Sequence, residues 1–412
     1  MTAGPLDHPD QLEPLLPNEA AMEPVLEKAH DLRTGAARLA GACQPAVSHE
    51  LTGLLAAMNS YYSNKIEGEH TRPIEIGQAL AQAFSKDTAK ARLQRLAVAH
   101  IETERWIRQE ARGTQALYSA DAVQDIHRHL FAQLDAQDRV VELHGTDGRV
   151  TRTLVVVPGE LRPGNVAIRR HVAPDAQALD ALLQRWSDGY GRVRRGEMQI
   201  VAVAAAHHRL TWIHPFHDGN GRAARLQSLA VLQSLGLTDG LWSPLRGLAR
   251  SGDTYAERLS NADMPRMGDL DGRGQRSQKM LVEWIDFFIS TCLDQVRFMT
   301  RMLNLQEMQN RLGALLAHEE KVVRVGIRME ALRPMHYLFA TQGQLGRRDF
   351  ADMTGLGERA ATTLIGKLLG AGLLVTDSPR GPLRFGIPLH ALRFLFPGLW
   401  PEAEADAAAG PD

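Results

Sequence analysis

The spacing of apolar residues is the feature that most limits how this chain can fold. Over long stretches, apolar side chains recur every three or four residues, which places them along one face of an α-helix. The predicted helices cover residues 23–42, 46–66, 74–110, 175–188, 197–213 and 278–315. We therefore predict a mainly α-helical protein.

One short region departs from the helical spacing. Residues 154–157 are a β-branched run that ends at Pro158-Gly159, and residues 166–168 follow the turn signal Pro163-Gly164-Asn165. We predict that these two segments form a small β-hairpin within the helical protein.

Charge and cysteine usage limit the class of protein further. The net charge is −1, which gives no overall attraction to nucleic acid or to anionic membranes. No stretch approaches the roughly 20 apolar residues that span a bilayer, and the N-terminus has no basic start or apolar run typical of a secretory signal. Cys43 and Cys292 form no metal-type pair, which suits a reducing compartment. We expect a cytoplasmic protein that does not contact membranes.

A glycine-containing turn follows the helix predicted at 197–213. Pro215 disfavours a helical conformation at His214, so that helix should end there. The next helix begins at Gly219-Asn220-Gly221, where the glycines let a ligand approach the backbone and the first N–H groups attract anions. The pattern predicts a turn that binds phosphate.

Charged side chains surround this turn. Arg222 and Arg225 lie on one side of the new helix, and two guanidinium groups suit a polyphosphate. Asp218 could bind Mg²⁺ together with substrate phosphates, and His214 could accept a proton from an attacking hydroxyl. Each of these residues alone is more often structural, and their combination within residues 214–225 is what indicates a nucleotide site.

The segment 214–225 resembles the signature of the Fic family, HPFx(D/E)GNGRxxR, and matches it at every specified position. Most members of that family are adenylyltransferases. The resemblance implies a helical catalytic core with a small hairpin flap, and transfer of AMP from ATP, with Mg²⁺, to a Ser, Thr or Tyr hydroxyl of a target protein. It implies these roles: His214 as general base, Asp218 as metal ligand, Gly219, Asn220 and Gly221 as anion hole, Arg222 as phosphate ligand and Arg225 as γ-phosphate ligand.

The resemblance extends to two regions outside the signature. Arg162, Val166 and Ile168 resemble the family's flap, which binds an extended segment of the target by strand addition, although Leu161 replaces the commoner aromatic residue. Tyr255 lies where the family often places an aromatic ring near adenine, and ordinary packing is its alternative role.

A second motif lies upstream, at residues 63–68. Ser63, Glu67 and Gly68 resemble the inhibitory motif (S/T)xxxE(G/N) of class II Fic proteins. The resemblance implies that Glu67 pairs with Arg225 and so inhibits the enzyme. The alternative is an ordinary helix end followed by glycine. Some class II relatives also use this glutamate to remove AMP, and that activity stays open here.

Residues 333–394 read as helix, turn, helix and two short strands, and resemble a winged helix-turn-helix. They hold eight Lys or Arg against four Asp or Glu, a modest excess for a DNA-binding module. We therefore favour packing, dimerisation or target docking over DNA binding for this module.

The predicted domains are a disordered N-terminus (1–22), a helical region with the inhibitory helix (23–110), the Fic catalytic core (111–305), a linker helix (306–332), the winged helix module (333–400) and a disordered tail (401–412). Three functions remain in competition. They are protein adenylylation, which we favour, another transfer such as that of phosphocholine or phosphate, and transcriptional regulation with the Fic domain as a nucleotide sensor. A homodimer and self-modification stay open.

Overall fold

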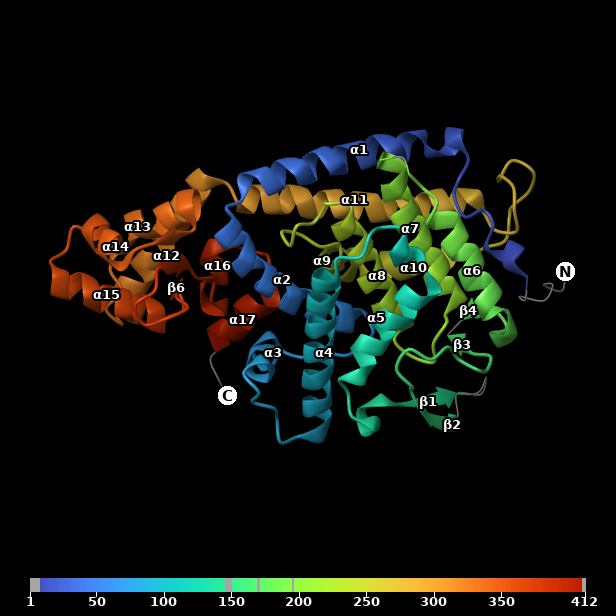
Figure 1. The fold of residues 1–412 in the computed structure, drawn as a ribbon, viewed down its shortest axis with the longest axis horizontal. Coiled ribbons are helices and arrows are strands. Elements are labelled where there is room, and N and C mark those ends of the chain that lie inside the picture. The colour runs from blue at the N-terminus through green and yellow to red at the C-terminus, as the bar shows by residue number, and fades with distance from the viewer. Residues whose placement is uncertain (1–7, 145–149, 169–170, 195, 410–412) are drawn as a thin grey trace.

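The computed structural model describes residues 8–144, 150–168, 171–194 and 196–409 (Figure 1). The molecule is mainly α-helical with a few short strands, as the apolar spacing predicts. Two long helices, α1 and α11, lie side by side along one edge and cover a central group of helices that includes α7 and α8 (Figure 1). The helices of this part are α1 Glu19–Ala42, α2 Pro45–Ile66, α3 Pro73–Leu80, α4 Thr88–Glu110, α5 Ala120–Ala132, α6 Leu179–Tyr190, α7 Gly196–Ile213, α8 Asn220–Ser234, α9 Leu245–Arg250, α10 Gly252–Ala262 and α11 Gln278–Met302.

Helix α7 is central because its sequence is apolar on every side. The run 200–206 consists of Ile, Val and Ala only, and all of these side chains are buried. A helix that is apolar all round has no face suited to water, so it packs in the interior. Helices α1, α6, α8 and α11 all contact it. Residues 214–219 therefore begin at the end of a helix that lies in the middle of the core.

The predicted helix at 74–110 is two helices. Helix α3 ends at Leu80, and α4 begins after Asp87, whose side chain accepts a hydrogen bond from the N–H of Lys90. This N-cap satisfies the free N–H groups of a new helix start, and apolar spacing alone does not reveal such a break.

The predicted strand pairing is wrong. Strand β2 (Val150–Val155) pairs with β1 (Val140–His144), and β3 (Ala167–Ile168) pairs with β4 (His171–Val172), in both cases antiparallel. Segments 154–157 and 166–168 do not pair, because the loop between them turns toward the residues after α7. There the N–H of Arg162 donates to the carbonyl of Pro215 at 2.9 Å.

The expected disorder of residues 1–22 does not hold from His8 onward. A short 3₁₀ turn (Pro9–Leu12) buries Leu12 completely, and the Tyr190 hydroxyl donates to the carbonyl of Leu15 at 2.8 Å. Residues 1–7 lie outside the described part of the chain.

The C-terminal part forms a separate group of helices beside α2 (Figure 1). Its small sheet has the strand order β5-β7-β6, and two helices lie where the sequence predicts the helix-turn-helix. Its identity as a winged helix stays a prediction. The elements are α12 Leu305–His318, α13 Leu332–Tyr337, β5 Gln344–Leu345, α14 Arg347–Thr354, α15 Glu358–Gly370, β6 Leu374–Val375, β7 Leu383–Phe385, α16 Leu392–Leu395 and α17 Pro401–Ala409.

The tail after Pro401 was expected to be disordered, but residues 401–409 form helix α17. Ala403 is 1% exposed, and the Glu402 carboxylate accepts from Tyr62 Oη at 2.9 Å and from Lys65 Nζ at 2.7 Å. The Ala- and Glu-rich composition that suggests disorder also favours a helix once a partner exists, and α2 is that partner. Among the described residues, no helix combines the length and the apolar character that crossing a bilayer requires.

Candidate active site

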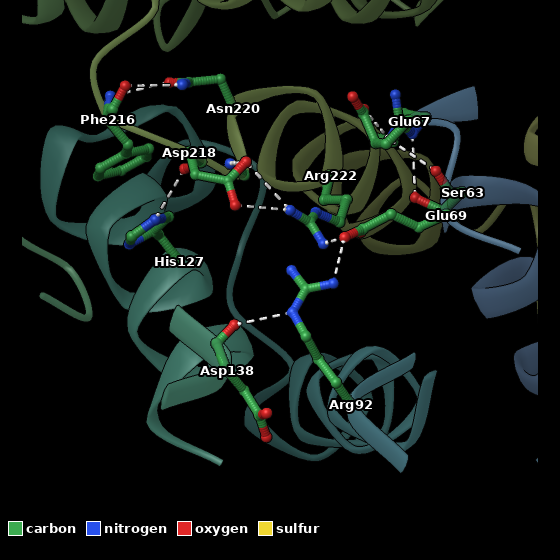
Figure 2. A network of polar contacts seen from close by, with 12 residues as sticks. Ser63, Glu67, Glu69, Arg92, His127, Asp138, Phe216, Asp218, Asn220 and Arg222 are labelled. Carbon is green, nitrogen blue, oxygen red and sulfur yellow. Dashed lines mark hydrogen bonds and ion pairs between the residues drawn. The ribbon is translucent and has the colours of Figure 1, made fainter. Parts of the chain in front are cut away.

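Residues 214–219, which we call the motif loop, connect α7 to α8. The loop is closed by the Asn220 side chain, whose Oδ1 accepts from the N–H of Phe216 and whose Nδ2 donates to the carbonyl of Phe216, both at 2.8 Å (Figure 2). Phe216 itself is buried. The Asn220 amide therefore serves the loop, and only its backbone N–H, in the first turn of α8, is left to face an anion.

Two glycines are required at the start of α8. Gly219 has φ +76°, and a Cβ there would lie 2.4 Å from Phe131 Cε2. A Cβ on Gly221 would lie 2.3 Å from Glu67 Oε1. A larger residue at position 219 would clash with the Phe131 ring, and one at position 221 would have to displace the end of the Glu67 side chain. The second contact also shows that the Glu67 carboxylate lies directly against the first turn of α8.

Asp218 pairs with Arg222 across this turn. Its Oδ1 and Oδ2 lie 3.1 and 3.0 Å from Arg222 Nη2, and Oδ1 also accepts from the N–H of Gly219 at 2.6 Å. Burial opposes the charged form, but Arg222 and the Gly219 N–H outweigh it and hold the pKa of the Asp218 carboxyl below its usual value. The carboxylate is therefore ionised, as a metal ligand must be.

His214 is the first residue of the motif loop, and it is partly buried. Burial lowers its pKa to about 3, and the charges of His171 and Arg162 act in the same direction. The ring centroids of His214 and His171 are 6.4 Å apart. His214 is thus neutral at physiological pH, which is the protonation state that a general base needs.

Arg162 holds the backbone of the motif loop through hydrogen bonds. Its side chain is 1% exposed, and it donates to the carbonyls of His214 at 2.8 Å, Gly164 at 2.8 Å and Pro174 at 2.6 Å. In this position the guanidinium holds His214 in place instead of facing a target. Val166, the second predicted flap residue, is partly exposed next to β3. Ile168 lies in β3, and its side chain is outside what the structure describes.

His127 of α5 is a supporting residue that the sequence did not reveal. Its Nδ1 accepts from the N–H of Gly159 at 2.9 Å, so its Nε2 carries the proton and donates to the carbonyl of Asp218 at 3.1 Å. The ring stacks on Phe216 with centroids 3.8 Å apart. Burial lowers its pKa to about 4, which keeps this tautomer neutral. His127 therefore fixes the loop that carries Asp218.

Arg225 lies one turn further along α8 and contacts the end of α2. Its Nη2 lies 2.5 Å from Glu67 Oε1, and its Nε donates to Ser63 Oγ at 3.0 Å. A further bond joins Nη2 to the carbonyl of Ser63 at 3.0 Å. The Arg225 side chain is 1% exposed, whereas that of Glu67 is 35% exposed. The structure thus brings the motif at 63–68 against the signature at 214–225, although about 150 residues separate them.

A second carboxylate from the same turn lies nearby. Glu69 Oε2 accepts from Arg222 Nη1 at 2.9 Å, and Glu69 Oε1 accepts from Arg92 Nη1 at 2.8 Å (Figure 2). Neither Glu69 nor Arg92 belongs to a motif that the sequence analysis recognised. Only the fold, which places α4 beside the start of α8, brings them to the site.

Tyr255 lies in the interior and is 4% exposed. Its hydroxyl lies 2.9 Å from His207 Nε2, and His207 Nδ1 lies 2.8 Å from Ser228 Oγ. Ser228 lies in α8 and donates to the carbonyl of Ala224, so a chain of hydrogen bonds runs from Tyr255 through His207 to α8. Packing accounts for Tyr255 in this structure, and its role beside adenine stays a prediction.

A cavity of about 440 Å³ adjoins the motif loop on the side of the strands. Its wall is formed by the end of β2, by the loop after it and by His217. His217 occupies the variable position of the signature, and here it faces the space next to the flap.

Comparisons with known proteins agree with this geometry. Residues 117–232 match the Fic/DOC family model. The protein adenylyltransferase Fic of Drosophila willistoni is 39% identical over 79 residues, which are 19% of this chain and 16% of that protein. The relative from Drosophila ananassae has the same identity and coverage. The chain thus spans 16% of the length of these curated relatives.

Two solved structures of Fic proteins align with large parts of the chain. A Fic family protein from Desulfovibrio desulfuricans has a TM-score of 0.48 at 16% identity, covering 88% of this chain and 96% of that one. Fic-1 from C. elegans has a TM-score of 0.47 at 15% identity, covering 69% of this chain and 73% of that one. The match to the family model is confined to residues 117–232.

Proposed function

We propose that this protein transfers AMP from ATP to a hydroxyl side chain of a target protein. The Fic domain match and the names of the relatives support this reaction class. The observation that carries the proposal is the position of the Glu67 carboxylate. It lies against Gly221 in the first turn of α8 and on Arg225, so an anion already occupies the place where a phosphate would bind.

The triphosphate would lie along the start of α8. The first N–H groups of the helix and the guanidinium of Arg222 would bind its inner phosphates, and Arg225 would bind the γ-phosphate. Arg222 Nε is buried and has no hydrogen-bond partner among the described residues, so this arginine retains a donor for a ligand. The arginines would neutralise charge that develops on the leaving pyrophosphate.

Mg²⁺ fits the donor set of this site. The ion keeps several waters and binds through one or two carboxylates together with substrate phosphates, and Asp218 is an ionised carboxylate beside the phosphate turn. A bound Mg²⁺ would supply charge neutralisation on the phosphates. Asp218 would have to turn from Arg222 toward the metal, which leaves Arg222 free to contact phosphate.

His214 would act as the general base. Its neutral imidazole would take the proton of the target hydroxyl while that oxygen forms a bond to the α-phosphorus. The bond from the α-phosphorus to the bridging oxygen breaks, and pyrophosphate leaves with the bonding electrons. Arg162 would hold the His214 backbone during the reaction, since its Nε–H binds the His214 carbonyl.

The target would dock beside the short strands. Strands β3 and β4 form a two-stranded sheet among the described residues, so each offers an edge for strand addition by an extended segment. Val166 lies at the start of this sheet, and the cavity beside His217 offers space for a flanking side chain. The hydroxyl would then approach His214 from the flap side.

Glu67 would inhibit the enzyme in this conformation, as in class II Fic proteins. Two charges about 4 Å apart attract by about 4 kcal/mol at an effective dielectric of 20, and desolvation removes much of this. A remaining bias of about 1–3 kcal/mol would reduce productive ATP binding roughly 5- to 150-fold.

Mass spectrometry of a lysate tests the reaction and finds the target together. The lysate is incubated with ATP, Mg²⁺ and the Glu67→Gly variant, and the Glu67→Gly/His214→Ala double variant is the control. We expect one AMP on a defined Ser, Thr or Tyr, present only with the intact His214. Phosphocholine or phosphate in place of AMP would redirect the assignment to another transfer, and no modification by protein that binds MgATP would contradict it.

A further inference from the structure

Glu69 bridges two arginines from different helices. Its two carboxylate oxygens are divided between them, with Oε2 on Arg222 of α8 at 2.9 Å and Oε1 on Arg92 of α4 at 2.8 Å. Figure 2 shows the carboxylate between the two guanidinium groups. A phosphate group has the same requirement for several charge-assisted donors arranged around its oxygens.

Arg92 depends on Glu69 for charge neutralisation. Its Nε donates to the backbone carbonyl of Asp138 at 3.3 Å, but the Asp138 carboxylate is bound by Arg95, at 2.5 and 3.0 Å. Glu69 is therefore the acidic side chain that pairs with Arg92 at the site. If Glu69 moved away, Arg92 would lose this carboxylate partner, and Arg222 would keep only its pairing with Asp218 among the two carboxylates described here.

Arg222 is a buried arginine that already binds anionic groups. Its side chain is 3% exposed, and it pairs with two carboxylates, Asp218 and Glu69. Under the proposed function Asp218 would hold Mg²⁺, and Glu69 is the second of the two carboxylates that would compete with a phosphate for Arg222. The buried Arg222 Nε without a partner among the described residues provides one more donor.

We propose that Arg92 and Arg222 together form an oxyanion subsite for a phosphate group of the bound nucleotide, and that Glu69 fills this subsite in the inhibited conformation. The inference rests on the proposed function and extends it in two ways. It adds to the nucleotide site a residue of α4, which lies outside the matched region 117–232. It also gives the inhibitory turn a second carboxylate, directed at a different arginine from the first.

The position of Glu69 makes release of both carboxylates a single event. Glu67 and Glu69 lie in the α2–α3 turn (residues 67–72), where the N–H groups of both donate to the carbonyl of Asn64 at 3.0 Å. Gly68 and His70 in the same turn are exposed, whereas Thr71 near its other end is 4% exposed and anchors the turn to the protein. Movement of this short turn would vacate Arg225 and the subsite of Arg92 and Arg222 at the same time.

Equilibrium binding of MgATP tests the subsite without knowledge of the target. Calorimetry would compare the wild type with Glu67→Gly, Glu69→Gln, Glu67→Gly/Glu69→Gln and Glu67→Gly/Arg92→Met. We expect the Glu67→Gly/Glu69→Gln variant to bind several-fold more tightly than Glu67→Gly. We expect Glu67→Gly/Arg92→Met to bind about tenfold more weakly than Glu67→Gly, because it lacks a charge-assisted bond to phosphate.

Matched controls separate this effect from a general change of charge. Arg105→Met in the Glu67→Gly background removes an exposed arginine of the same helix and should leave the affinity unchanged. Arg92→Lys, which keeps the charge, should recover part of the affinity, and thermal melting would report whether each variant is folded.

The outcomes distinguish the inference from the function on which it rests. If Glu67→Gly binds MgATP and the Arg92→Met change has no effect on folded protein, Arg92 is outside the nucleotide site and the inference fails alone. If Glu69→Gln weakens binding in either background, Glu69 does not compete with phosphate and the inference also fails. If no folded variant binds MgATP, the proposed function fails and the subsite fails with it.

Discussion

The motif loop and the α2–α3 turn meet at the start of α8, but they are held in different ways. The motif loop is fixed by hydrogen bonds and packing in the interior, through Asn220, His127 and Arg162. The α2–α3 turn contacts the same helix through two carboxylates that retain exposure, 35% for Glu67 and 20% for Glu69. The difference teaches that, under the proposed function, the part proposed to be catalytic is built in advance and the part proposed to inhibit it is held less firmly.

The energetic reason lies in what each contact costs to break. Opening the motif loop would leave buried amide and carbonyl groups without partners, at about 1–3 kcal/mol each. Separating a partly exposed carboxylate from its arginine costs less, because water and a phosphate can take its place. Under the proposed function, a nucleotide would displace the turn while the loop keeps its shape.

The largest effect should follow the loss of the base. His214→Ala in the Glu67→Gly background should reduce the rate of AMP transfer about 10²- to 10⁴-fold, since proton removal from the hydroxyl is lost. MgATP affinity, measured by calorimetry, should change little, because the phosphate turn is held by other residues. A comparable loss of affinity would show that the loop is less independent of His214 than its contacts indicate.

Removing the first inhibitory carboxylate should have the next largest effect. Glu67→Gly should raise MgATP affinity and self-modification roughly 5- to 150-fold, because Arg225 becomes available to the γ-phosphate. Labelled ATP and calorimetry would measure both quantities. Glu67→Gln keeps the shape of the side chain and should give most of the same gain. Equal activity of the wild type and both variants would refute inhibition by this turn.

Unfolding measurements should separate the two regions in stability. Asn220→Ala should lower the free energy of unfolding by about 1–3 kcal/mol, since it leaves the Phe216 backbone groups buried without partners. Glu67→Gly should change it by less than about 1 kcal/mol, because Glu67 is partly exposed and the buried Arg225 keeps its hydrogen bonds to Ser63. Urea titrations of both variants would test this order, and the reverse order would overturn the comparison.

The smallest effect concerns pH and again involves the motif loop. The pKa of His127 is about 4 in the folded protein and near 6.5 when unfolded, so the unfolded chain binds more protons between these values. The free energy of unfolding should therefore fall as the pH drops below about 6.5, by roughly 1 kcal/mol from this residue at pH 5.5. Urea titrations at pH 7.5 and 5.5 should show a smaller decrease for His127→Asn than for the wild type. An equal decrease in both proteins would mean that His127 does not titrate in this way.

Local sequence patterns predicted the elements whose formation depends on residues close together in sequence. The helical spacing located α1, α2, α6 and α7, and the signature placed the motif loop between two helices. The hairpin partner could not be predicted from the strand segments, because the loop after β2 bonds to Pro215, far away in sequence. The helix after Pro401 could not be predicted for the same reason, because the residues of α2 that it contacts lie far away in sequence.

The site was predictable to the extent that its residues are consecutive. Residues 214–225 form one motif that can be read from the sequence alone, and their roles stay predictions. Glu69, Arg92 and His127 have no recognisable spacing relative to that motif, since they reach it through the packing of α4 and α5 on α8. Asn220 shows a further limit, because the motif predicts its position in the turn but not the direction of its side-chain amide.

Helix α17 places the last part of the described chain on the last turns of α2. Glu402 binds Tyr62 and Lys65, which flank Ser63 in sequence, and Ser63 in turn holds Arg225. Helix α2 therefore connects the C-terminal region to Arg225 through hydrogen bonds at both sides of the helix. A displacement of α17 would therefore shift the last turns of α2. A truncation before Pro401 would remove the bonds from Glu402 to Tyr62 and Lys65.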